Sequence, residues 1–231
     1  MLQSINKYKL YFYLFFFIFL SSIFNFKIIE NYQDKFRLKK IIINGLSIDE
    51  TNMVKNELNY FQNVNIFKLS KEEILKRLNK FDYLDDIYVN KIIPSSININ
   101  LTKTSFLGQT QINGENFYIG KNGKLINSSQ LFEIYKLPSV FGEFKVKEFL
   151  NLQNALNFHN LKTKNIDRYF YYKNKRWDLI FSNGMTLMLP SKNIKNSLKI
   201  YKELLKNNNL INTRIIDLRV TNQIILTNEN E

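Results

Sequence analysis

The chain has 231 residues, a formal net charge of +13 and no cysteine. The lack of cysteine excludes a disulfide framework, thiolate catalysis and cysteine-based zinc sites. Lysine outnumbers arginine by 27 to 6, and because arginine is the residue that reads bases and stacks on them, this balance argues against nucleic-acid binding.

An uncharged apolar run at residues 10–26 is the first predicted element. At about 1.5 Å per residue it covers roughly 25 Å, which with snorkelling of Lys9 is enough to cross a bilayer core of about 30 Å. A cleaved signal peptide is the rival, but Leu20-Ser21-Ser22 is a poor cleavage site and the apolar run continues past it. We expect a short tail at 1–9, a transmembrane anchor at 10–26 and a stalk at 27–37.

Positive residues flank this run on both sides and leave its orientation open, because long domains translocate largely regardless of charge. A basic face near anionic lipid headgroups would account for part of the charge excess.

Residues 38–105 are predicted to form a β-α-α-β-β unit. A β-branched strand at 39–44 stops at Gly45, and Ser47 and Ser70 each begin a capping-box pattern followed by apolar residues at helical spacing. A strand at 86–93 turns at Pro94 into an alternating strand whose apolar members are Ile97, Ile99 and Leu101. This order, with Ile43-Asn44-Gly45, Asn65-Ile66-Phe67, Tyr83-Leu84 and Ile93-Pro94, resembles a POTRA domain, which implies an interaction module.

Residues 106–231 are predicted to form a second, β-rich domain with flanking helices. Asn-Gly pairs punctuate its strands, and Phe149, Leu152 and Leu156 mark one face of a helix. We expect a hairpin at 178–189 with a type I′ turn at Asn183-Gly184. A helix with Ile194, Leu198, Tyr201 and Leu205 follows, and strands at 213–218 and 223–227 end the chain.

An enzyme is the hypothesis from another class, and the residues give it little support. His159 is the only histidine, no second histidine or cysteine is available for a triad or a metal site, and the glycines match no phosphate-binding loop. The paired acids at 72–73 and 85–86 lie in a helix's first turn and beside a strand, where no buried dyad is expected. We expect no catalysis, no metal, no cofactor and no small-molecule substrate.

Four features of the second domain carry a more specific resemblance. They are Arg176-Trp177-Asp178-Leu179, the hairpin with Gly184, the helix with Leu198, and Ile216-Asp217-Leu218-Arg219 before a terminal strand. Together with the anchor and the POTRA-like unit, they resemble the bacterial FtsQ/DivIB cell division family. The expected fold class is therefore α+β, with one N-terminal transmembrane helix, a POTRA domain and a β domain.

The resemblance implies a single-pass inner-membrane protein, with a cytoplasmic N-terminus and periplasmic domains, that acts as a non-enzymatic scaffold at the division septum. Its implied partners are FtsB-like and FtsL-like proteins and other components of the divisome. A POTRA-bearing envelope assembly or secretion factor is the alternative, although the chain lacks the length for a following barrel.

A terminal strand with an unpaired edge can accept a strand from another chain. We expect the partner-binding residues in or beside that edge, namely Leu218, Arg219, Val220, Thr221, Asn222 and Ile224. Structural roles compete with this interpretation, because Asp217 and Arg219 can form a structural ion pair and Ile224 and Leu226 can face the core.

Overall fold

The computed structural model describes residues 7–22, 34–206, 210, 212–220 and 223–228. Helix α1 (Lys7–Ser22) holds most of the expected anchor, and its large apolar side chains are exposed. None of the helices in these ranges combines the length and the apolar character that crossing a membrane requires. Residues 1–6 of the expected tail, 23–26 of the anchor and 27–33 of the stalk lie outside the described residues.

A small α+β unit follows. Its elements are β1 (Lys40–Asn44), α3 (Ile48–Leu58), the 3-10 helix η1 (Asn59–Phe61), α4 (Lys71–Leu78), β2 (Leu84–Ile92) and β3 (Ser96–Lys103). Its strands lie in the order β1-β3-β2, with β1 parallel and β2 antiparallel to β3. The sheet is therefore mixed, and the elements follow one another in the β-α-α-β-β order that the sequence indicates.

Side-chain caps begin both helices of this unit. At α3, the Glu50 N–H donates to Ser47 Oγ and the Ser47 N–H donates to the Glu50 carboxylate, which completes the expected capping box. At α4, Ser70 caps the N–H of Glu72 and bonds to the Glu72 carboxylate, instead of the expected pairing with Glu73. The cap is present, one residue earlier than the capping-box spacing predicts.

The core of the small unit lies between its two helices and one face of its sheet. Ile97, Ile99 and Leu101 are buried there, as their alternation predicts. Gly45 ends β1 with φ +95°, and a Cβ at this position would lie 1.9 Å from the Leu101 carbonyl oxygen. Glycine is therefore required at the point where the strand turns toward α3.

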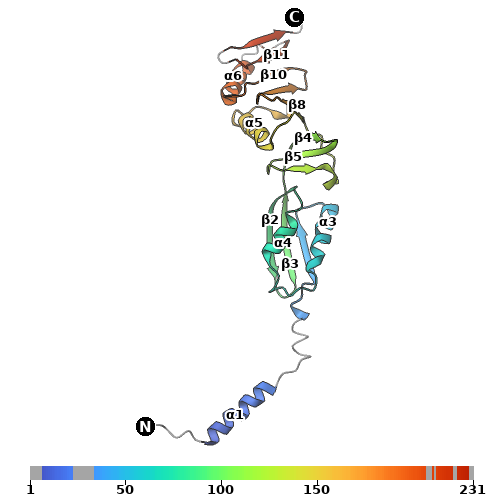
Figure 1. Ribbon diagram of the computed structural model, residues 1–231, viewed down its shortest axis with the longest axis vertical. Helices are drawn as coiled ribbons and strands as arrows, with labels where there is room; N and C mark the ends of the chain where they lie inside the picture. The colour runs from blue at the N-terminus through green and yellow to red at the C-terminus, as the bar shows by residue number, and fades with distance from the viewer. Residues whose placement is uncertain (1–6, 23–33, 207–209, 211, 221–222, 229–231) are drawn as a thin grey trace, which may run out of the picture.

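The remaining strands form one nine-stranded mixed sheet. They are β4 (Phe106–Ile112), β5 (Glu115–Gly120), β6 (Leu125–Asn127), β7 (Ser139–Phe141), β8 (Ile166–Tyr171), β9 (Trp177–Phe181), β10 (Thr186–Met188), β11 (Thr213–Asp217) and β12 (Ile225–Asn228). Their spatial order is β12-β11-β10-β9-β8-β7-β4-β5-β6. The edges of the sheet are therefore β12 and β6. The small unit and β12 lie at opposite ends of an elongated body (Figure 1).

Two Asn-Gly turns in this sheet differ in type. Asn113 and Gly114 both have positive φ, 51° and 84°, and join Ile112 to Glu115 as a type I′ turn. At the β9–β10 hairpin only Gly184 has positive φ, and its N–H donates to the Phe181 carbonyl at 2.9 Å. The expected type I′ turn at Asn183-Gly184 is therefore wrong: the loop has three residues, with glycine in the left-handed position.

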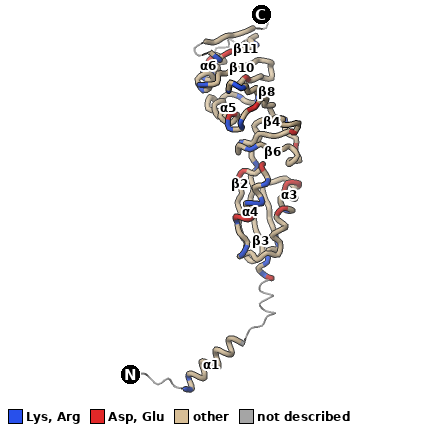
Figure 2. The backbone as a smooth tube through the Cα atoms, viewed as in Figure 1, with Lys and Arg blue, Asp and Glu red and all other residues tan. Residues whose placement is uncertain are grey.

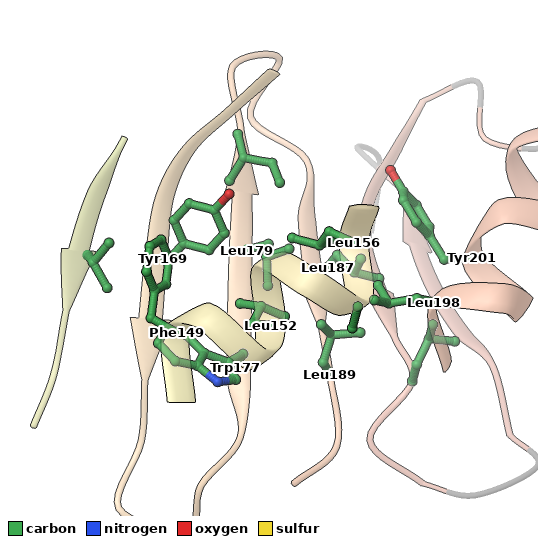
Figure 3. Close-up of a cluster of buried hydrophobic side chains, with 14 of the residues drawn as sticks. Phe149, Leu152, Leu156, Tyr169, Trp177, Leu179, Leu187, Leu189, Leu198 and Tyr201 are labelled. Carbon is green, nitrogen blue, oxygen red and sulfur yellow. The ribbon is translucent and has the colours of Figure 1, made fainter. Parts of the chain in front are cut away.

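Two helices, α5 (Val146–Phe158) and α6 (Ile194–Lys206), pack on the sheet, and the 3-10 helices η2 (Ser128–Gln130) and η3 (Thr163–Asn165) lie in its connections. Figure 3 shows Leu152 and Leu156 of α5 and Leu198 of α6 beside Leu179 and Leu187 of the strands. All five side chains are buried. The α+β class is thus confirmed, with a small mixed sheet and a large mixed sheet flanked by helices.

The two sheets are joined by packing and by polar contacts. Ile126 of β6 is fully buried in the apolar cluster of the small unit. The Asn122 side chain donates to the Asp82 carbonyl at 3.0 Å. The Lys103 ammonium, from β3, donates to the Glu50 carboxylate at 2.5 Å and to the Tyr135 hydroxyl at 2.8 Å. These contacts tie the last strand of the small unit to the large one.

Candidate partner-binding edge

Strand β12 forms the outer edge of the large sheet. It pairs antiparallel with β11, which pairs in parallel with β10 on its other side. The register places Asp217 opposite Ile225 and Ile216 opposite Leu226. Within the described part of the chain, no strand lies on the outer side of β12. This side is therefore open to another chain.

The two faces of β12 differ in their surroundings. One row across four strands lies on the helix-covered face and consists of Leu179, Leu187, Ile216 and Leu226. The next row lies on the opposite face and consists of Asp178, Met188, Asp217 and Ile225. At the edge itself, Leu226 is 36 % exposed and Ile225 is 50 % exposed. The other three residues in the row of Leu226, namely Leu179, Leu187 and Ile216, are fully buried. Both faces of β12 thus present apolar surface.

The backbone of Leu226 points toward the open side. The Leu218 N–H donates to the Met188 carbonyl of β10 at 3.0 Å. Because successive residues of a strand direct their backbone groups to opposite sides, Asp217 faces β12, and its partner Ile225 faces back to β11. Leu226 follows Ile225 and therefore directs its N–H and C=O outward.

A charge-assisted pair holds the chain where β11 ends. The Arg219 guanidinium donates to both carboxylate oxygens of Asp217, and the Arg219 backbone N–H donates to Oδ1 at 2.9 Å. Hydrogen bonds from Arg219 hold the pKa of the mostly buried Asp217 below its usual range, against the opposing effect of burial. The chain therefore leaves β11 in a fixed direction.

A second carboxylate in the same row is less well satisfied. Asp178 is 4 % exposed, and burial raises its pKa. Its Oδ1 lies 3.8 Å from Nε of Arg176, and neither atom has a hydrogen-bond partner. Asp178 and Asp217 flank Met188 on one face, two strand spacings or about 10 Å apart. A buried carboxylate with a poor ion-pair partner thus lies in β9, which β10 and β11 separate from the edge strand.

The structure describes four of the six expected partner-binding residues, and these four precede β12 in the chain. Leu218 is buried, at 3 % exposure, so its side chain belongs to the core. Arg219 pairs with Asp217, whereas Val220 and Ile224 are 52 % and 45 % exposed. Thr221 and Asn222 lie outside the described residues. The Gln223 N–H donates to the Val220 carbonyl at 3.2 Å, which brings the two exposed residues to one turn.

Sequence reasoning missed two residues of the edge, Ile225 and Leu226. They are exposed in β12 itself, whereas the expected residues precede it. The available signal was the unbroken run Ile224-Ile225-Leu226, because consecutive apolar residues place apolar surface on both faces of a strand.

No other cluster in the described ranges suggests chemistry. Groups of three or more acidic or histidine residues that could hold a metal are absent there. His159 is the C-terminal cap of α5, with its ring against that of Phe158.

Comparison with known proteins identifies the family. The family described as cell division protein FtsQ/DivIB, C-terminal, matches residues 109–219. "Cell division protein FtsQ" of Rickettsia bellii is 30 % identical over 191 residues, which cover 81 % of this chain and 71 % of the relative. The protein of the same name from Rickettsia prowazekii is 31 % identical over 195 residues, with the same coverage. The chain belongs to the FtsQ/DivIB family of cell division proteins.

FtsQ/DivIB proteins are non-enzymatic, so the expectation that this chain is not an enzyme is confirmed, and the alternative of an assembly or secretion factor is set aside. The FtsQ/DivIB match ends at Arg219, so β12 lies beyond it. A solved structure of the major extracytoplasmic domain of DivIB from Geobacillus stearothermophilus covers 48 % of this chain, at 12 % identity and a TM-score of 0.34. That likeness is too weak to support a conclusion.

Proposed function

We propose that this chain is a scaffold of the division septum that binds an FtsB-like partner, together with its FtsL-like companion, by adding a partner strand to β12. The observation that carries the proposal is the open side of β12, toward which Leu226 directs its N–H and C=O. In strand addition, main-chain hydrogen bonds provide affinity and alternating side chains provide selectivity.

The side chains around this edge suit a partner strand with apolar residues. Val220, Ile224 and Ile225 are each 45 % exposed or more, and they surround the turn between β11 and β12. Removing such side chains from water favours a complex, and this gain offsets part of the cost of ordering the two chains on binding. Of the six expected residues, Val220 and Ile224 are therefore proposed as direct contacts, and Leu218 and Arg219 as supports.

The proposed location is the bacterial inner membrane at the septum, with residues 10–26 as a single-pass anchor, the N-terminus in the cytoplasm and the folded units in the periplasm. The uncharged run and the exposed apolar side chains of α1 support an anchor. Residues 38–105 are proposed to be a POTRA domain that contacts other division proteins, which the order of β1, α3, α4, β2 and β3 supports.

The test replaces Leu226 by proline. Proline lacks the N–H that Leu226 directs outward, and it is tolerated on an edge strand when that N–H faces away from the sheet. We expect Leu226→Pro to weaken binding of the full chain to the extracytoplasmic segment of the FtsB-like protein by about tenfold, which corresponds to about 1.4 kcal/mol. Leu226→Ala, which keeps the N–H, is the matched control and should bind more tightly than the proline variant.

The binding measurement uses the full chain in detergent or nanodiscs, with the melting temperature as a check of folding. Equal binding by the proline and alanine variants would place the partner elsewhere while leaving family membership intact. Lack of binding by the native chain, even with a partner tethered to the same membrane, would refute the scaffold proposal, because tethering raises the effective concentration.

A further inference from the structure

One end of the small unit combines basic and apolar exposed side chains. Strands β1 and β3 are parallel and β2 is antiparallel to them, so the starts of β1 and β3 and the end of β2 lie together at this end. The segment 36–40 runs through it. Its backbone bonds to residues 64–66 on one side, where the Leu38 N–H donates to the Val64 carbonyl, and to Ser95 on the other, through the N–H of Lys39.

The positive charges at this end, here called the basic end, are Lys35, Arg37, Lys39, Lys40, Lys68 and Lys91. All six are exposed, and Arg37 is the one that forms an ion pair within the described residues, with Asp34. The first turn of α4 places a negative charge, Glu72, near Lys91. The hydrogen bond from Ser70 is the largest cause of the lowered pKa of Glu72, and the charge of Lys91 is the smallest. In Figure 2, Lys and Arg (blue) lie at the end of the small unit that is farthest from β12, beside an acidic segment (red), and other Lys and Arg are spread along the body.

Apolar side chains project from the same end. Phe67, Ile92 and Ile93 are 61 %, 46 % and 57 % exposed, and the Phe67 ring lies 5.3 Å from that of Phe36. Exposed aromatic and aliphatic side chains surrounded by lysine are typical of surfaces that enter the interface of a bilayer, where the lysine stems snorkel toward the headgroups.

The chain itself brings this end close to a membrane. Residue 34 lies at the basic end, eight residues after the last residue of the apolar run at 10–26. Eight residues reach at most about 28 Å when fully extended. If the apolar run is an anchor, the basic end is thus held within a short distance of the headgroups.

We propose that the basic end of the small unit docks on the surface of a bilayer that contains anionic phospholipids. Lysine and arginine would contact the headgroups, and Phe67, Ile92 and Ile93 would enter the interface. Docking of this kind fixes the direction in which the elongated body leaves the membrane, and so the height of β12 above it. The inference rests on the anchor proposed above and is independent of strand addition at β12.

The test uses the full chain in vesicles and a single introduced cysteine, because the native chain has none. Ile92→Cys carries an environment-sensitive fluorophore at the basic end, and Asn174→Cys carries it on the exposed loop between β8 and β9. We expect the label at 92 to enter an apolar environment in vesicles of phosphatidylcholine with phosphatidylglycerol, but not in phosphatidylcholine alone. The label at 174 should stay in water in both.

Charge reversal tests the electrostatic contribution to docking separately from the apolar one. Lys39→Glu, Lys40→Glu and Lys68→Glu together should abolish the blue shift at residue 92, since each cation near an anionic surface changes partitioning by roughly fivefold. The matched control reverses Lys147, Lys173 and Lys192, which are exposed on the large unit, and should keep the shift. Salt at 1 M, where the Debye length is about 3 Å, should abolish it in the native chain.

Three results would overturn the proposal in different ways. If the chain floats with the vesicles but the label at residue 92 stays in water, the anchor proposal stands and the docking proposal is refuted. A chain that does not associate with anionic vesicles at all would refute both. Equal blue shifts in neutral and anionic vesicles would refute the role of anionic lipid, provided that Trp177 fluorescence confirms folding of every variant.

Discussion

The Arg219 guanidinium donates from Nε to both carboxylate oxygens of Asp217, two residues earlier in the chain, at 2.9 and 2.8 Å. Asp217 ends β11 in a buried position, and Arg219 begins the connection to β12. The pair therefore links the interior of the sheet to the residues proposed to bind a partner.

Loss of this pair should lower the stability of the fold. Arg219→Ala leaves a buried carboxylate without its cation, and because Arg219 is partly exposed we expect a loss of only about 1 kcal/mol in the free energy of unfolding. Urea unfolding followed by Trp177 fluorescence measures this. Arg168→Ala removes an exposed arginine and should change stability by less than half as much. Equal losses in the two variants would contradict a role for the pair.

The pH dependence of stability should differ in sign between two carboxylates. Asp217 has a lowered pKa when folded, so it contributes stability above its unfolded pKa of about 3.9, and this contribution is lost as the pH falls through the lower folded value. Asp178 has a raised pKa when folded, so its contribution is present below about pH 3.9 and is lost as the pH rises through the folded value.

Asp178→Asn should therefore raise the melting temperature at neutral pH and have little effect in acid. Asparagine removes the cost of keeping a buried charge that lies 3.8 Å from Arg176 without a hydrogen bond to it. Melting curves at both pH values test this, with the exposed Asp167→Asn as the control. A lower melting temperature at neutral pH would mean that the Arg176 pair outweighs burial.

The aromatic core offers a direct test of packing. Phe149 is fully buried, with its ring 5.9 Å from that of Trp177 and 5.2 Å from that of Tyr169. Phe149→Ala should cost about 3–5 kcal/mol, because it removes apolar contacts and leaves a cavity. Phe158, which is 69 % exposed, provides the control: Phe158→Ala should cost less than about 0.5 kcal/mol. Denaturant midpoints measure both.

The ion pair between Lys103 and Glu50 should stabilise the small unit, to which both residues belong. Burial by itself raises the pKa of Glu50, but bonds from Lys103 and Ser47 bring it below its usual range. Lys103→Met leaves the Glu50 carboxylate buried without a cation and should cost about 2–3 kcal/mol. The double variant Glu50→Gln, Lys103→Met should recover most of this loss in urea unfolding. Additive losses would contradict coupling.

Local patterns predicted the elements of the fold well. Ser47 with Glu50, the alternation of Ile97, Ile99 and Leu101, and the helical spacing of Phe149, Leu152 and Leu156 each depend on contacts within a few residues. Such contacts are encoded locally, so the sequence reveals them. The type of the Asn183-Gly184 turn was not predicted, because the register of β9 and β10 selects a three-residue loop and leaves one positive φ.

The candidate site was predicted only in outline. That the last strand is an edge followed from its position in the chain, but which residues are exposed on it depends on the pairing of β11 with both β10 and β12. Leu218 is buried because its N–H bonds to Met188, a residue 30 positions earlier. Pairing between distant segments has no local signature, and so Ile225 and Leu226 were missed.

The burial of Ile126 bears on how many strands the large sheet can accept. Ile126 packs in the core of the small unit and its strand β6 has only three residues, so we expect another strand to add to the large sheet at β12 and not at β6. A sheet that accepts a strand at one edge only cannot propagate as a chain of sheets. Two copies could meet through this sheet only symmetrically, β12 against β12, and that dimer would exclude the partner strand. Self-association and partner binding through β12 are therefore mutually exclusive.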